Sequence, residues 1–148
     1  MFGIACKMVN DRDVAKDIVQ EVFIYYYEKM QNGFEADHLQ SWLVRAAINK
    51  SIDYLNKKKK HTSLLALSET ATDDDKNLET QQRNTMLHQA IAKLKPLEMK
   101  MVVLYSEEYS YKEIAEITEF NFASVGKTLS RTLNKLKIIL NQSNYEMY

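Results

Sequence analysis

Residues 109–140 read YSYKEIAEITEFNFASVGKTLSRTLNKLKIIL, and this stretch decides the fold of the C-terminal part of the chain. Ser110 stands three residues before Glu113, which is the spacing of a capping box, where each side chain bonds the other residue's backbone amide. The spacing predicts a helix that begins at Tyr111. Its inward-facing residues are expected to be Ile114, Ala115 and Ile117. A short helix, a tight turn and a longer helix in this order are typical of a helix-turn-helix.

The second helix of this pair combines an apolar stripe with basic residues. The stripe recurs at helical spacing and consists of Val125, Leu129, Thr132, Leu136 and Ile139. The other faces carry Lys127, Arg131, Lys135 and Lys137, and residues 124–140 contain no acid. In a helix-turn-helix the second helix enters the DNA major groove, where cations contact phosphates. An amphipathic hairpin with a solvated charged face would account for the same basic residues.

The turn between the two helices is unusual because residues 118–121 contain no glycine. Such turns often need a positive φ, which glycine adopts most readily. Asn121 is therefore expected to take that conformation, and Asn121 or Ser124 is expected to cap the second helix. Gly126 lies inside that helix, at a cost of about 1 kcal/mol relative to alanine. Both features weaken the DNA-binding interpretation.

The composition of the chain predicts an all-α protein of two small helical domains joined by a flexible linker. The 148 residues are 45% hydrophobic and include only three glycines and one proline, so few turns are encoded. Helices are expected over residues 14–30, 39–59 and 79–95, and the last of these ends at the break marked by Pro96. The first domain is assigned to residues 1–60, the acidic linker to 61–78 and the helix-turn-helix domain to 79–148.

Charge is distributed unevenly although the net charge is zero. Residues 61–85 carry two basic and five acidic side chains, whereas residues 1–60 carry ten and eight, and residues 86–148 carry eight and seven. Non-specific affinity for DNA is mostly electrostatic. A neutral protein is therefore expected to need a partner that holds it on DNA.

The sequence contains no pattern that indicates catalysis or a cofactor. The three histidines, at 38, 61 and 88, lack metal-ligand spacing, and no glycine-rich phosphate loop or nucleophile elbow occurs. The single cysteine, Cys6, is expected to be a buried small side chain. No apolar run reaches 18 residues and no signal peptide is evident, so a cytoplasmic protein without membrane insertion, metal or cofactor is expected.

Two upstream helices carry candidate binding residues. On the first, two apolar stripes leave a third, mixed face that suits a protein interface, formed by Asp17, Gln20, Glu21 and Ile24. On the second, Arg45, Asn49 and Asp53 stand at i, i+4 and i+8, ahead of the lysine run at 57–60. Phe34 and Trp42 could line a place where unpaired bases stack, but a lone tryptophan is more often core, and core is the preferred interpretation for Trp42.

These segments together resemble bacterial RNA polymerase sigma factors of the compact extracytoplasmic-function group. The resemblance rests on DIVQEVF at 17–23, LQSWLVRAAINKSIDYL at 39–55, the lysine run, the break at Leu94-Lys95-Pro96 and the terminal helix-turn-helix, in that order. It covers most of residues 2–140 apart from the linker. Because the family usually begins further upstream, the first domain is expected to be shortened at its N-terminus.

The resemblance implies a promoter-specificity subunit that is not an enzyme and that works with core RNA polymerase on promoter DNA. Asp17, Gln20, Glu21 and Ile24 would contact a coiled coil of the polymerase's largest subunit, with Phe23 partly in the core. The unwound minus-ten strand would be bound by Arg45, Asn49, Lys50, Asp53, Lys57 and Lys58. The minus-thirty-five element would be read by Ser124, Lys127, Thr128 and Arg131. An anti-sigma protein is a further candidate partner.

The chain also departs from the family pattern. Gly126 and Thr128 stand where the family's second helix often has basic residues, and Glu119 stands where its turn usually has glycine. Two other functions therefore stay open: a helix-turn-helix regulator that is independent of polymerase, and a helical adaptor that has lost DNA contact. A regulator would prefer duplex DNA without polymerase, and salt-dependent DNA binding by the polymerase complex would exclude the adaptor.

Overall fold

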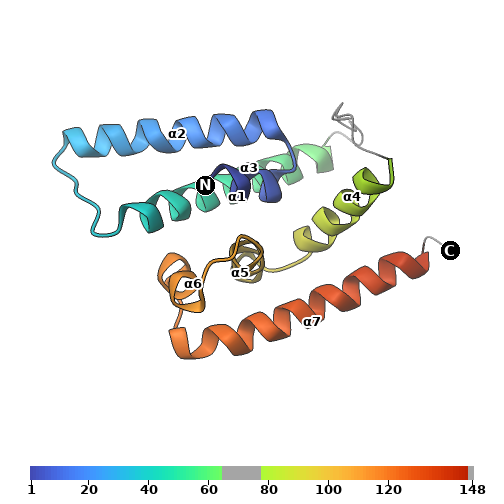
Figure 1. The fold of residues 1–148 in the computed structure, drawn as a ribbon. Coiled ribbons are helices and arrows are strands. Elements are labelled where there is room, and N and C mark those ends of the chain that lie inside the picture. Colours follow the sequence, from blue (N-terminus) through green and yellow to red (C-terminus); the bar gives the residue numbers. More distant parts are fainter. Residues whose placement is uncertain (65–77, 147–148) are drawn as a thin grey trace. The chain divides into compact units, whose positions relative to one another are not determined.

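The structure is a computed structural model that describes residues 1–64 and 78–146, and its regular structure there is entirely helical. This confirms the predicted all-α class. The helices are α1 (Phe2–Val9), α2 (Arg12–Gln31), α3 (Leu39–Leu64), α4 (Leu78–Ala92), α5 (Pro96–Ser106), α6 (Tyr111–Thr118) and α7 (Phe122–Glu146) (Figure 1). The chain divides into two compact units, Met1–Asp73 and Asp74–Tyr148, called unit 1 and unit 2 below.

The expected linker differs from the structure at its two ends. Helix α3 continues to Leu64, past the predicted start of the linker at residue 61, and α4 begins at Leu78. The lysine run at 57–60 does not end α3, because four lysines in an exposed helix have high helical propensity. The rest of the predicted linker, residues 65–77, lies outside the described residues.

Unit 1 is a three-helix arrangement in which α1 packs against both α2 and α3, and these two pack against each other. In Figure 1, α2 and α3 run side by side and are joined by a loop at one end. One cluster of the buried core consists of Ala5, Val9, Ala15, Ile18, Val22 and Ala47, and Cys6 is partly buried against it. Ile4, Met8, Val44 and Ile48 are also buried in this unit. Small residues in this core allow the helix axes to approach closely.

Local capping sets both ends of α2. The Asp11 carboxylate accepts bonds from the backbone amides of Asp13 at 3.0 Å and Val14 at 3.2 Å, which satisfies two amides of the first turn. At the other end Gly33 has φ 86°, and the amide of Phe34 donates to the carbonyl of Lys29 at 3.0 Å. This is a Schellman ending, which glycine favours because it has no Cβ to clash. The ending directs the chain into the loop that precedes α3.

Unit 2 places α7 against α4, α5 and α6. Pro96 is the first residue of α5, where a missing amide hydrogen costs nothing. The Glu98 carboxylate accepts bonds from the amide of Lys95 at 3.0 Å and from the ammonium of Lys135 at 3.1 Å. One acid therefore both caps α5 and ties it to α7. The predicted stripe of α7 packs inward, with Val125, Leu129, Thr132 and Leu136 buried and Ile139 partly buried.

The helix-turn-helix forms where residues 109–140 predict it, with α6 and α7 joined by a short turn. The capping box is present, because Glu113 N donates to Ser110 Oγ at 3.1 Å and Ser110 N donates to Glu113 Oε1 at 3.1 Å. Asn121 caps α7 by accepting a bond from Ala123 N at 3.1 Å.

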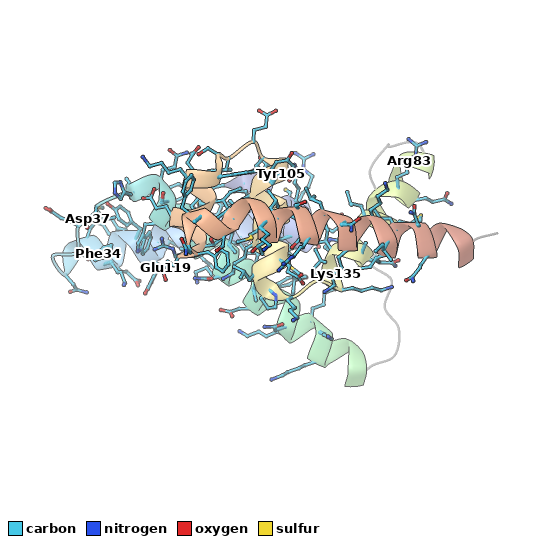
Figure 2. All side chains as sticks on the ribbon, turned by 90° about the horizontal axis from the view of Figure 1, so that it is seen from below. Phe34, Asp37, Arg83, Tyr105, Glu119 and Lys135 are labelled. Carbon is cyan, nitrogen blue, oxygen red and sulfur yellow. The ribbon has the colours of Figure 1, made fainter. Side chains whose placement is uncertain are left out.

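The residue with positive φ in this turn is Glu119, at φ 56°, so the expectation for Asn121 was wrong. Figure 2 labels Glu119 in this turn. The physical reason is that the left-handed residue must directly follow α6. It ends that helix while the amide of Phe120 bonds the carbonyl of Ala115 at 3.0 Å. Asn121 lies two residues further along the chain and caps α7.

Gly126 has a packing role that its sequence position does not reveal. A Cβ at this position would lie 3.3 Å from Cε2 of Tyr111, the first residue of α6. That distance is tighter than ordinary van der Waals contact. The absence of a side chain at Gly126 therefore lets the Tyr111 ring lie against α7 and brings the two helices close together.

Candidate nucleic-acid interface

The mixed face of α2 is exposed along its length. Asp17, Gln20 and Glu21 are all exposed, and Ile24 is 58% exposed. Beside them, Tyr27 is 58% exposed, so the face is apolar as well as charged. An exposed apolar patch rimmed by polar residues is typical of a protein-binding surface.

Phe23 was expected to lie partly in the core, but it is 51% exposed. Ile18 and Val22 occupy the face of α2 that meets the other helices of unit 1. Phe23 follows Val22 by one residue, about 100° around the helix, which turns its ring away from that face. The ring therefore adds to the exposed apolar part of α2.

The candidate residues on α3 lie beside its buried face. Val44, Ile48 and Ser51 are buried, and the Ser51 hydroxyl donates to the carbonyl of Ala47 at 2.8 Å. The predicted DNA-binding set divides by burial, with Arg45 and Lys50 partly buried and Asn49, Asp53, Lys57 and Lys58 exposed. Arg45, Asn49, Asp53 and Lys57 follow at i, i+4 spacing and form a ridge along α3, and no member of the set is sealed in the interior.

One ion pair connects the two predicted surfaces of unit 1. The ammonium of Lys50, expected to contact DNA, lies 3.6 Å from a carboxylate oxygen of Glu21, expected to contact polymerase. The two side chains are 34% and 62% exposed, so the pair contributes between about 0 and 1 kcal/mol to stability. A binding partner can displace an ion pair of that strength.

Four aromatic residues converge where α2 ends and α3 begins, and we call Tyr25, Tyr26, Phe34 and Trp42 the aromatic cluster. The ring of Trp42 stacks on Tyr25 with centroids 5.8 Å apart and planes at 16°. It lies 5.3 Å from Tyr26 and 5.6 Å from Phe34, tilted against both. Trp42 is only partly buried, whereas the sequence interpretation preferred a core position.

Two lysines lie over the rings of the aromatic cluster. The Lys29 ammonium is 4.9 Å from the centroid of Phe34, 5.1 Å from Tyr25 and 6.0 Å from Trp42. The Lys50 ammonium is 5.9 Å from the centroid of Tyr25. These are cation–π distances, and such contacts contribute from about 0.5 to about 2 kcal/mol, according to how dry the site is. The cluster therefore combines flat apolar rings with positive charge.

On α7 the four predicted DNA-reading residues share one face, because Ser124, Lys127, Thr128 and Arg131 follow at helical spacing. Lys127 and Arg131 are exposed, whereas Ser124 and Thr128 are partly buried. The carbonyl of Thr128 accepts a 2.8 Å bond from the buried Thr132 hydroxyl, which fixes the backbone beneath this face.

Lys135 and Lys137 are also exposed, but Lys135 is engaged with Glu98 on α5. The Lys95 amide, and after it the Lys135 ammonium, hold the pKa of Glu98 below its ordinary value. Glu98 therefore stays ionised at neutral pH and keeps the ammonium of Lys135 at α5. Figure 2 labels Lys135 partway along α7.

Sequence reasoning missed three candidate residues of unit 1 and one of unit 2. The helical spacing places Tyr25 and Tyr26 on the two apolar stripes of α2 and gives them no binding role. Lys29 continues the stripe of Ile18, Val22 and Tyr25 at the same spacing. A cation in an inward-facing stripe was the available signal. In unit 2 Phe122, the first residue of α7, is 59% exposed. An apolar residue at the start of the second helix was the signal for it.

The described part of the chain contains neither a metal-binding cluster nor a membrane-spanning helix. Among residues 1–64 and 78–146, no three His, Cys, Asp or Glu side chains gather closely enough to hold a metal ion. Over the same ranges, no helix has the length and hydropathy needed to cross a bilayer.

Each of the two units matches a known family model. Residues 1–61 match the family model described as sigma-70 region 2, and residues 84–136 match sigma-70 region 4. The chain is 29% identical over 145 residues to the RNA polymerase sigma factor SigV of Bacillus subtilis, an alignment that covers 97% of this chain and 86% of SigV. It is 23% identical over 147 residues to the ECF RNA polymerase sigma factor SigM of the same organism, covering 96% and 89%.

A solved structure has a similar fold. The sigma factor RpoE of Bartonella quintana, crystallised in complex with the anti-sigma factor NepR, aligns with a TM-score of 0.64. The alignment covers 95% of this chain and 89% of RpoE at 20% sequence identity. At that identity the likeness concerns the fold.

Proposed function

This chain belongs to the sigma-70 family, in its extracytoplasmic-function group, and we propose that the surfaces described above are the ones with which it contacts polymerase and promoter. It is a promoter-specificity subunit of RNA polymerase. The observation that carries this function is the presence of regions 2 and 4 of the family, in order, on one chain. The assignment of individual residues rests on their exposure and chemistry.

The exposed face of α2 is the proposed polymerase-binding surface. Ile24 and Tyr27 supply apolar area that becomes buried on docking, and burial of such area drives association. Asp17, Gln20 and Glu21 surround them and would form the polar rim. A coiled coil of the polymerase's largest subunit suits this strip, because two helices pack along their lengths.

The aromatic cluster and the ridge on α3 are the proposed site for the opened minus-ten strand. An unpaired base can stack on an aromatic ring for about 1–3 kcal/mol. In the cluster Tyr25 is exposed, and the other three rings are partly buried. Arg45, Asn49, Lys50 and Asp53 lie along the helix that carries Trp42 and supply polar contacts. Lys57 and Lys58, further along α3, would contact the sugar-phosphate backbone.

Helix α7 is the proposed reader of the minus-thirty-five element. Lys127 and Arg131 would contact phosphates or guanine edges, and Ser124 and Thr128 would contact the adjacent groove. We add Phe122 to this set. Its exposed ring stands at the N-terminal end of the helix, where base contacts are made, and an apolar side chain there can contact a thymine methyl group.

In this proposal residues 1–60 act as the minus-ten domain, residues 79–148 act as the minus-thirty-five domain and residues 61–78 connect them. The neutral net charge explains why polymerase is required, since the protein alone has no large electrostatic attraction to DNA. It acts as a non-enzymatic subunit in the cytoplasm, where polymerase and promoters are found. Because RpoE of Bartonella quintana was crystallised with an anti-sigma factor, such a protein is a candidate partner here too.

Run-off transcription on a pool of genomic fragments, with core polymerase alone and with core polymerase plus this chain, tests the proposal. The chain should produce new discrete transcripts. A mixture that gives only the products of core polymerase would contradict the function. A regulator independent of polymerase would instead bind duplex fragments equally well without core enzyme.

A pull-down of core polymerase tests the α2 surface separately. Replacing both Gln20 and Glu21 by alanine should weaken the association by about tenfold, the loss expected for about 1.4 kcal/mol at an interface. Lys16→Ala, an exposed change on the same helix, is the matched control and should have no effect. Equal recovery of polymerase by the double variant would remove these residues from the interface.

A further inference from the structure

Lys29 lies over three of the four rings of the aromatic cluster. Its side chain is partly buried although it ends in a charge, and its ammonium lies within 6.0 Å of the centroids of Phe34, Tyr25 and Trp42. One cation shared among three rings is held by their negative faces.

The backbone of Lys29 is as constrained as its side chain. Its carbonyl accepts bonds from the amides of Asn32 at 3.1 Å and Phe34 at 3.0 Å, within the Schellman ending of α2. These bonds fix where the side chain leaves the helix relative to the Phe34 ring. Beyond that point lysine is a flexible four-carbon stem, so the ammonium can move several ångströms while the backbone stays in place.

A nucleobase that stacks on the cluster needs ring faces that the Lys29 ammonium now covers. Stacking therefore requires the ammonium to move aside. Every nucleotide that brings a base also brings a phosphate, and lysine binds phosphate as a point charge. The displaced ammonium remains tethered beside the incoming nucleotide, where that phosphate is the nearest strong anion.

From these contacts we infer that Lys29 is a phosphate-binding latch of the single-strand site: it covers the rings in the free protein and transfers to the phosphate of the nucleotide whose base replaces it. The inference rests on the proposed function, since it assumes that the aromatic cluster receives an unpaired base. The exchange of one cation contact for another keeps the positive charge partnered in both states. It also favours a nucleotide over an uncharged aromatic molecule.

Salt dependence of single-strand binding provides the test. The affinity of a random-sequence single-stranded DNA pool is measured over a range of salt concentrations for holoenzyme, assembled from core polymerase and the full chain, with core polymerase alone as baseline. Because log K falls as log salt rises, this slope is negative, and loss of one phosphate contact reduces its magnitude by about 0.7 for a single strand. Lys29→Met should show this change. If the variant and the original protein bind equally at about 1 M salt, the variant should bind about fivefold more weakly at about 0.1 M.

Two further variants separate charge from structure. Lys29→Arg keeps the charge and should retain the slope of the original protein. If Lys29 only packed against the rings, its replacement by arginine would not need to preserve the slope. Lys16→Met removes an exposed lysine from the same helix, away from the rings, and should leave both slope and affinity unchanged. In the full chain alone, the emission of Trp42, the single tryptophan, should change in Lys29→Met and stay constant in Lys16→Met.

The latch role of Lys29 and strand capture by the aromatic cluster can fail separately. If holoenzyme binds the pool more tightly than core polymerase and Lys29→Met has the original slope, the latch is overturned and strand capture stands. If holoenzyme binds no better than core polymerase, strand capture by this cluster fails and the latch fails with it. An equal loss of slope magnitude in Lys29→Met and Lys29→Arg would also overturn the latch, since the charge at position 29 would then not be the cause of the salt dependence.

Discussion

Units 1 and 2 differ in how they present positive charge. In unit 1 Lys29 lies over three aromatic rings and Lys50 pairs with Glu21, so cations next to the proposed strand site already have partners within the protein. In unit 2 Lys127 and Arg131 are exposed on one face of α7. Under the proposed function, strand binding by unit 1 exchanges existing contacts, whereas duplex binding by unit 2 adds contacts to solvated side chains. Equal numbers of cations therefore need not give equal affinities.

The largest expected effect belongs to the aromatic cluster. Trp42→Ala should reduce promoter opening by holoenzyme by about 5- to 150-fold, because one stacked base contributes about 1–3 kcal/mol. Permanganate reactivity of unpaired thymines measures the opening. Trp42→Phe keeps a ring and should lose much less. Full opening by Trp42→Ala would show that unit 1 does not depend on its rings and would remove the contrast between the units.

A smaller effect is expected on the exposed face of α7. Arg131→Ala should reduce the magnitude of the negative slope of log K against log salt by about 0.9 for duplex binding by holoenzyme. If the two proteins bind equally at about 1 M salt, the variant should bind about eightfold more weakly at about 0.1 M. Filter binding over a salt series measures it. Lys93→Ala, an exposed change near the end of α4, is the control. An unchanged slope in Arg131→Ala would mean that exposure on α7 does not indicate phosphate contact.

The two helical hairpins also differ in the residue that ends their first helix, which is Gly33 with φ 86° in unit 1 and Glu119 with φ 56° in unit 2. Left-handed backbone costs a residue with a Cβ roughly 1 kcal/mol relative to glycine. Glu119→Gly should therefore stabilise the protein by about 1 kcal/mol, and Gly33→Ala should destabilise it by a similar amount. Urea unfolding followed by circular dichroism measures both. The two variants should change the free energy of unfolding in opposite directions. If Glu119→Gly destabilises the protein instead, the Glu119 side chain must make a stabilising contact.

The smallest effect concerns Glu98. Because its pKa is lowered in the folded protein, its contribution to stability is present above the ordinary pKa of 4.5 and is lost as the pH falls through the lower folded value. Glu98→Gln should therefore reduce the free energy of unfolding by about 0.5 kcal/mol at pH 7, and the difference should vanish in acid. Glu28→Gln, at an exposed site on α2, is the matched control. A difference that persisted in acid, after the Glu98 carboxylate is protonated in the folded protein, would exclude the charge as the cause.

Residues close together in sequence explain why much of the fold could be predicted. The predicted capping box of Ser110 and Glu113 joins residues three positions apart. The cap at Asp11 and the glycine ending at Gly33 are equally local. The buried stripe of α7 follows from helical spacing alone. The exposure of Phe23 and the partial burial of Trp42 were not predicted, since both depend on which neighbouring helix occupies the space. The positive φ at Glu119 was missed for a local reason, because it depends on the residue at which α6 ends.

The sequence by itself determined the helices, most of their capped ends, the order of the two family regions and the exposed faces that carry Gln20, Glu21, Lys127 and Arg131. These follow from local hydrogen bonds and from helical periodicity, which act over a few residues. Only the tertiary structure decided that Lys29, Phe34 and Trp42 meet, that Lys50 pairs with Glu21 and that Glu98 holds Lys135. Apart from the meeting of Lys29 with Phe34 across the ending of α2, those contacts join different helices, and their geometry depends on how buried side chains set the distance and rotation between the helix axes.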